Sequence, residues 1–166
     1  MQNHYNYVFD NITNTYNFTT KNNILYRVAF IVDNTFSTIT GEEIPNVFQI
    51  VIEKAIEGIE PLDIKVARTI ENVVERFFEK IENSLIYVCY DLDQKALSRH
   101  NLFERWYQKS KSKENIIKID KVIEITIKDF EKQRLFTAFM FHKKNVNYKK
   151  LIEIYNNIEE VLNAEK

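Results

Sequence analysis

Glycine is scarce in this chain of 166 residues, which contains only Gly41 and Gly58. Glycine-rich loops let a backbone approach phosphate groups closely, and Rossmann and P-loop nucleotide sites depend on such loops. A sequence with so little glycine therefore argues against both kinds of nucleotide site.

Cysteine is nearly absent, and long apolar runs are missing. Cys89 is the single cysteine, so no intrachain disulfide can form, and the three scattered histidines add no metal-ligand spacing. No segment resembles a signal peptide, and no apolar stretch approaches the ~20 residues that span a bilayer. We therefore expect a cytoplasmic protein with no membrane contact, no metal and no cofactor.

The composition is otherwise that of a globular protein, with 45% hydrophobic and 28% charged residues. A chain of this length can bury roughly 70% of its unfolded surface, and no linker or internal repeat divides it. The sequence thus predicts one domain that spans residues 1–166.

Hydrophobic periodicity predicts an α+β fold. The expected order is β-β-β-α-β-α-β-β-α, in a mixed, largely antiparallel sheet with helices packed on it. A helix from Asp63, a plausible N-cap, to Glu82 separates two strands, which should therefore be parallel if they share the sheet. The expected strands cover residues 1–20 (loosely), 24–32, 47–52, 85–90, 117–127 and 135–141, and the expected helices cover 63–82, 94–108 and 146–163.

The acidic pair Asp91 and Asp93 directly follows the buried strand 85–90. Two carboxylates at the end of a strand can hold Mg²⁺ beside a phosphate, but the downstream partners of a phosphatase site cannot be placed. The alternative is structural, with Asp91 stabilising the turn and Asp93 capping the next helix. In that case Arg99 would pair with one of the two carboxylates.

The helix that follows is basic and aromatic. Arg99, Arg105, Trp106 and Tyr107 are candidate binding residues, because arginine and aromatic side chains dominate interfaces and can also stack on single-stranded bases. In the structural alternative, Trp106 and Phe103 belong to the core. Residues 94–113 hold six basic side chains against one acidic, while residues 42–82 hold ten acidic against five basic, and such asymmetry can mark a partner surface.

The chain resembles a family of small uncharacterised bacterial proteins, chiefly from Bacteroidota, known as a domain of unknown function. The resemblance is carried by three segments, TIENVVERFF (69–78), LIYVCYDLD (85–93) and SRHNLFERWY (98–107). The shared pattern is a strand that ends in paired aspartates, then Arg, Leu-Phe and Arg-Trp. The chain departs from it at Asn145-Val146, where the family often has Asn-Pro. The resemblance implies no activity.

The order strand, helix, strand, helix and two strands is also similar to the second half of the Gcn5-related acetyltransferases. In those enzymes a glycine-rich turn before the first helix binds the pyrophosphate of acetyl-CoA. The matching segment here, residues 58–70, lacks that turn, and Asp63 would repel the pyrophosphate. If the folds are related, this resemblance implies that the cofactor site is lost.

The sequence therefore favours a non-enzymatic module that binds a protein partner, of the kind found in toxin–antitoxin or phage-conflict cassettes. It names no catalytic residue. The alternative is a divergent or degenerate acyltransferase of the Gcn5-related type. A third hypothesis is weak binding of single-stranded nucleic acid through residues 94–113.

Overall fold

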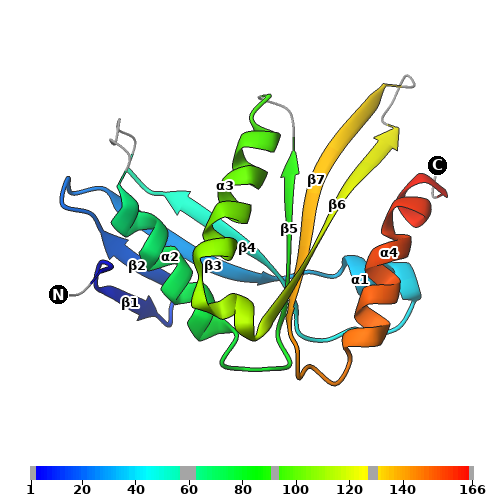
Figure 1. Ribbon diagram of the computed structural model, residues 1–166, viewed down its shortest axis with the longest axis horizontal. Helices are drawn as coiled ribbons and strands as arrows, with labels where there is room; N and C mark the ends of the chain where they lie inside the picture. The colour runs from blue at the N-terminus through cyan, green and yellow to red at the C-terminus, as the bar shows by residue number, and fades with distance from the viewer. Residues whose placement is uncertain (1–2, 57–62, 91–93, 127–130, 165–166) are drawn as a thin grey trace.

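A single seven-stranded mixed sheet organises the computed structural model (Figure 1). The structure describes residues 3–56, 63–90, 94–126 and 131–164. Neighbouring strands are antiparallel except β4 and β5, which are parallel as the sequence predicts. From one edge to the other, the strands are β1 (Tyr7–Asp10), β2 (Thr15–Thr19), β3 (Leu25–Val32), β4 (Val47–Lys54), β5 (Ser84–Tyr90), β7 (Lys132–His142) and β6 (Ile116–Thr126).

Helices cover both faces of the sheet. On one face, α2 (Ile64–Phe77) lies over β1–β4, and α3 (Ala96–Lys109), followed by a 3₁₀ turn (Lys111–Glu114), lies over β5, β7 and β6 (Figure 1). On the other face, α1 (Thr35–Thr40) and α4 (Tyr148–Ala164) pack on the β5–β7–β6 half of the sheet. The α+β class and the mixed sheet are therefore as the sequence predicts.

The structure differs from the expected elements in three details. The loose first strand is a hairpin of β1 and β2, whose turn contains Asn14 with a left-handed φ of 53°. The short helix α1 was not expected, because its six residues are too few to show a helical period. Helix α2 ends at Phe77 rather than near Glu82, since the Asn83 side chain donates to the Phe77 carbonyl at 2.8 Å and the chain turns there.

The start of α2 was predicted correctly. The Asp63 carboxylate accepts a hydrogen bond from the backbone N–H of Lys65 at 2.9 Å, which is the geometry of an N-cap. The Tyr5 hydroxyl also donates to this carboxylate, and the bond lowers the pKa of Asp63. Among the described residues, no helix is long and apolar enough to cross a bilayer.

The parallel pair at the centre of the sheet is short. Strands β4 and β5 pair only at Val47–Ser84, Phe48–Leu85 and Gln49–Ile86. Beyond these three pairs β4 stays with β3 and β5 stays with β7, so the two strands diverge toward their carboxyl ends (Figure 1). We call this gap in the sheet the wedge.

Candidate functional site

The backbone groups that face the wedge follow from strand alternation, because successive residues of a strand direct their N–H and C=O groups to opposite neighbours. The Ser84 N–H donates to the Asn46 carbonyl at 2.8 Å, so Ser84, and with it Val88 and Tyr90, faces the β4 side. The Asp33 N–H donates to the Val47 carbonyl at 2.9 Å, so odd-numbered residues of β4 face β3. The even-numbered residues of β4 therefore face β5.

Within the described part of the chain, peptide groups without a strand partner therefore line both sides of the wedge. On β4 they are the carbonyl of Ile50 and both groups of Ile52, and on β5 they are both groups of Val88 and the N–H of Tyr90. The Tyr90 carbonyl is already occupied, because the Arg99 guanidinium donates to it at 2.6 Å. Two facing strand edges of this kind can accept an extended chain that carries amide groups.

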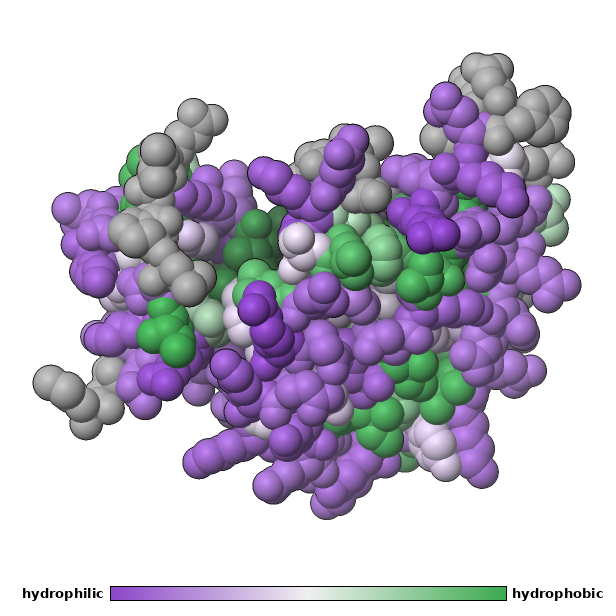
Figure 2. All heavy atoms as spheres, turned by 45° about the horizontal axis from the view of Figure 1, so that its top comes forward, coloured by the Kyte–Doolittle hydropathy of each residue, from purple (hydrophilic) through white to green (hydrophobic). Residues whose placement is uncertain are grey.

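An apolar cavity of about 60 Å³ lies where the wedge closes, between α2 and α3. Ile50 and Tyr87 line the cavity, and they directly follow Gln49–Ile86, the last pair of β4 and β5. Its accessible wall is almost wholly apolar, with further contributions from Ile70, Val74, Leu85, Phe103, Trp106 and Met140. Figure 2 shows hydrophobic side chains gathered in a recess on the side of the molecule where the wedge opens.

The four residues of α3 that the sequence suggested for binding are divided between the cavity and the surface. Trp106 and Tyr107 line the cavity, and Trp106 packs edge-on against Phe103 with ring centroids 5.3 Å apart. Trp106 is half-buried rather than fully in the core, and Arg105 is exposed. The Tyr107 hydroxyl donates to the Ile116 carbonyl at 2.7 Å. The candidates therefore do not form one surface patch.

Arg99 is half-buried and reaches back to the end of β5. It donates to Tyr90 and lies beside Cys89. Burial raises the pKa of the Cys89 thiol, although Arg99 opposes that shift, so the thiol stays protonated at neutral pH. Asp91 and Asp93 lie outside the described residues, and their expected ion pair with Arg99 stays a prediction.

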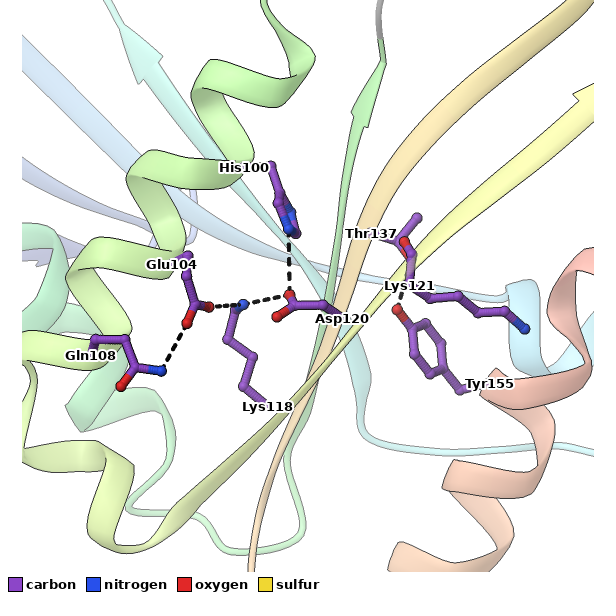
Figure 3. Close-up of polar contacts among 8 residues, drawn as sticks. All are labelled: His100, Glu104, Gln108, Lys118, Asp120, Lys121, Thr137 and Tyr155. Atoms are coloured by element: carbon purple, nitrogen blue, oxygen red, sulfur yellow. Dashed lines mark hydrogen bonds and ion pairs between the residues drawn. The ribbon is translucent and has the colours of Figure 1, made fainter.

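A buried charge cluster adjoins the cavity, and the sequence did not predict it. The Lys118 ammonium lies between the carboxylates of Glu104 on α3 and Asp120 on β6, and its side chain is 1% exposed (Figure 3). It also stands 6.0 Å from the Tyr87 ring centroid and 5.8 Å from that of Tyr107. In the sequence, Lys118 alternates with isoleucines, and this pattern predicts a side chain on the solvent-exposed face of a strand.

Hydrogen bonding and burial set the protonation states in this cluster. The Lys118 hydrogen bond lowers the pKa of Glu104, so this carboxyl is ionised at neutral pH. Burial lowers the pKa of His100, whose Nε2 is 3.7 Å from Asp120, despite the opposing effect of that carboxylate. Burial also raises the pKa of Tyr87, which stays neutral. One ammonium against two carboxylates leaves the cluster with a net negative charge, which disfavours an anion in the neighbouring cavity.

Metal binding finds no support in the described residues, where no group of three or more His, Cys, Asp or Glu side chains is placed to hold an ion. The N-terminus of α2 does not fit a pyrophosphate either. The Asp63 carboxylate accepts the Lys65 N–H there, its lowered pKa keeps it ionised at neutral pH, and its negative charge would repel a phosphate.

Comparison with known proteins gives a family and no function. No curated protein and no solved structure matches the chain. Residues 62–157 match a family of unknown function (DUF6169), and this range holds α2, β5, α3, β6, β7 and the first part of α4. Because the match covers more than half of the chain, the protein belongs to this family of unknown function.

Proposed function

We propose that the chain binds an acyl thioester of pantetheine in the wedge and is a divergent acyltransferase of the Gcn5-related type. The observation that carries the proposal is the interrupted pairing of β4 and β5 above an apolar cavity. Pantetheine is a slender chain with two amide groups, and its thioester end is apolar. The amides match the open edges of Ile52 and Val88, and the apolar end matches the cavity.

Topology supports the same proposal. The order β4-α2-β5-α3-β6-β7, with β4 parallel to β5, resembles the second half of the Gcn5-related acetyltransferases. A fold resemblance alone is a weak argument for activity, so the open peptide groups carry more weight. The residues at the start of α2 do not fit the pyrophosphate of coenzyme A, and affinity would come from the pantetheine arm.

Removing one donor from the wedge tests the proposal. Val88→Pro deletes an N–H that faces β4, whereas the β5–β7 hydrogen bonds use the alternate residues. The preceding residue, Tyr87, is already extended, as a residue before proline must be. We expect the variant to keep its circular dichroism spectrum and to lose about five- to tenfold in affinity for S-acetyl-pantetheine, which corresponds to the roughly 1–1.4 kcal/mol that one hydrogen bond contributes.

The matched control is Arg105→Ala on the exposed side of α3, which should bind as the wild type does. Calorimetry that detects no binding of S-acetyl-pantetheine to the wild type at millimolar concentration would refute the proposal. Release of free thiol in the presence of amine acceptors would show whether binding leads to acyl transfer.

The second candidate is the protein-binding module that the sequence favours. The same open edges can accept an extended peptide of a partner by strand addition. A peptide must place a side chain of one residue in the narrow cavity. Selection from a random peptide library, followed by calorimetry with the selected peptide and with S-acetyl-pantetheine, separates the two candidates, because a protein-binding module should bind the peptide and not the thioester.

A further inference from the structure

We infer that the chain forms a two-fold symmetric dimer, in which the β1 strands of two copies pair antiparallel and join their sheets into one. Strand β1 is one edge of the sheet, and β2 and β3 separate it from β4 and the wedge (Figure 1). The inference is therefore independent of the proposed function. It is carried by a strand edge that has open peptide groups and exposed apolar side chains.

The outward peptide groups of β1 are those of Tyr7 and Phe9. The Thr20 N–H donates to the Ile24 carbonyl at 2.9 Å, so the even-numbered residues of β2 face β3 and the odd-numbered residues face β1. The odd-numbered residues of β2 lie opposite the even-numbered residues of β1 and bond to them. Tyr7 and Phe9 therefore direct their N–H and C=O groups away from the sheet, and no group in the described part of the chain binds them.

The opposite edge of the sheet, β6, is protected from such pairing. The Tyr107 hydroxyl occupies a carbonyl near its start. Near its end, Glu159 of α4 accepts the Glu124 N–H at 3.3 Å and Asn163 donates to the Glu124 carbonyl at 2.9 Å. Covering helices, charged side chains, proline and bulges are the devices that keep edge strands apart. Residues 3–9 contain no Lys, Arg, Asp, Glu or Pro, and β1 pairs with β2 without a bulge, so the β1 edge is open to another strand.

One antiparallel register of two β1 strands uses all of these open groups. It places Val8 opposite the partner's Val8, so Tyr7 lies opposite the partner's Phe9 and each such pair exchanges two hydrogen bonds. Val8 and Phe9, which are 70% and 43% exposed in one copy, then pack on apolar side chains of the other. Asp10 is the only charged residue of β1 and lies opposite the partner's Asn6, so no like charges meet. The strand is thus its own complement, which favours a second copy over a foreign strand.

Sedimentation equilibrium at protein concentrations up to about 1 mM tests the inference, because so short a strand pair should form a weak dimer. Phe9→Pro removes one outward N–H from each copy and no bond within the sheet, and the residue before it is already extended. We expect the variant to keep its circular dichroism spectrum and its dimer to dissociate at least tenfold more readily, since symmetry removes two hydrogen bonds. Val122→Pro is the matched control, because it removes an outward N–H from the β6 edge.

Disulfide cross-linking tests the register. In the proposed dimer the two Val8 residues form a non-hydrogen-bonded pair, whose Cα atoms lie about 4.5 Å apart, within reach of a disulfide. Mild oxidation should therefore convert Val8→Cys into a covalent dimer, while the natural Cys89 is buried and does not react. Val122→Cys, at a position 50% exposed on the other edge, should stay monomeric.

Three results would each overturn the inference. A wild type that stays monomeric up to about 1 mM would show that the β1 edge does not bind a second copy and is left for a strand of another protein. Equal weakening of the dimer by Phe9→Pro and Val122→Pro would place the interface elsewhere. Equal cross-linking of Val8→Cys and Val122→Cys would contradict the register.

Discussion

Replacing Lys118 with methionine is expected to lower the free energy of unfolding by about 2 kcal/mol at pH 7. Methionine keeps most of the apolar stem of the side chain and removes the ammonium. In the folded protein this ammonium donates to Glu104 and Asp120 and is 1% exposed. The variant would leave the two carboxylates without their shared cation.

The magnitude follows from the exposure of the partners. A hydrogen bond to a charged group contributes roughly 1.5–3 kcal/mol when both partners are buried. Glu104 and Asp120 are 35% and 42% exposed, so solvent screens each bond and water can hydrate the carboxylates in the variant. We therefore take about 1 kcal/mol for each bond. For a chain of this length the sum corresponds to a fall of about 6 °C in the melting temperature.

The loss should also depend on pH. Lys118 holds the pKa of Glu104 below its ordinary value of 4.5 in the folded protein. A carboxyl with a lowered folded pKa adds stability above its unfolded pKa, and this contribution disappears as the pH falls through the folded value. The difference between Lys118→Met and the wild type should therefore be full at pH 7 and should shrink below about pH 4.

Urea denaturation at pH 7 and at pH 3.5 measures both effects. The control is Lys150→Met, which removes the pair with Glu42. These two side chains are 53% and 66% exposed, so solvent screens the pair and the free energy of unfolding should stay close to that of the wild type. Equal losses in the two variants would show that burial of Lys118 adds nothing to its ion pairs. A loss that is unchanged at pH 3.5 would contradict the role of Glu104.

Three further predictions concern other parts of the molecule. Tyr155→Phe removes the hydroxyl that lies 2.7 Å from the Thr137 hydroxyl (Figure 3) and should cost about 1 kcal/mol in urea denaturation. Burial raises the pKa of Tyr155 to about 12, above its ordinary value of 10.0, so the wild type should lose stability between pH 10 and pH 12, and the variant should lose less. Asp63→Asn keeps an N-cap but removes the charge at α2, so acetyl-CoA should bind about fivefold more tightly than to the wild type, while S-acetyl-pantetheine binds equally well. Single-stranded DNA should bind weakly and only at low salt. Phe103, Trp106 and Tyr107 line the cavity and cannot stack on bases, so only electrostatic attraction to the phosphates remains. Sub-micromolar affinity in an anisotropy titration at about 0.15 M salt would contradict this.

Local chemistry made much of the fold predictable. Alternation of apolar and polar residues located β3, β4, β6 and β7, because side chains of a strand point to its two faces in turn. A continuous apolar run located β5, because a strand buried on both faces needs apolar side chains at successive positions. Asp63 located the start of α2 for an equally local reason, since an N-cap bonds to residues two or three positions away. The resemblance of residues 69–107 to a family of unknown function was also correct.

The wedge and the charge cluster depend on contacts between residues far apart in the sequence. How far β4 and β5 remain paired is decided by the strands on their outer sides, since β4 follows β3 and β5 follows β7. Lys118 lies on the polar face of an alternating strand, and only the packing of α3 across that face brings Glu104 to it and removes it from water. Sequence by itself therefore determined the elements and their buried faces, because these are properties of neighbouring residues. The tertiary structure alone decided where the sheet opens and which charges are buried, because both depend on how separate elements pack.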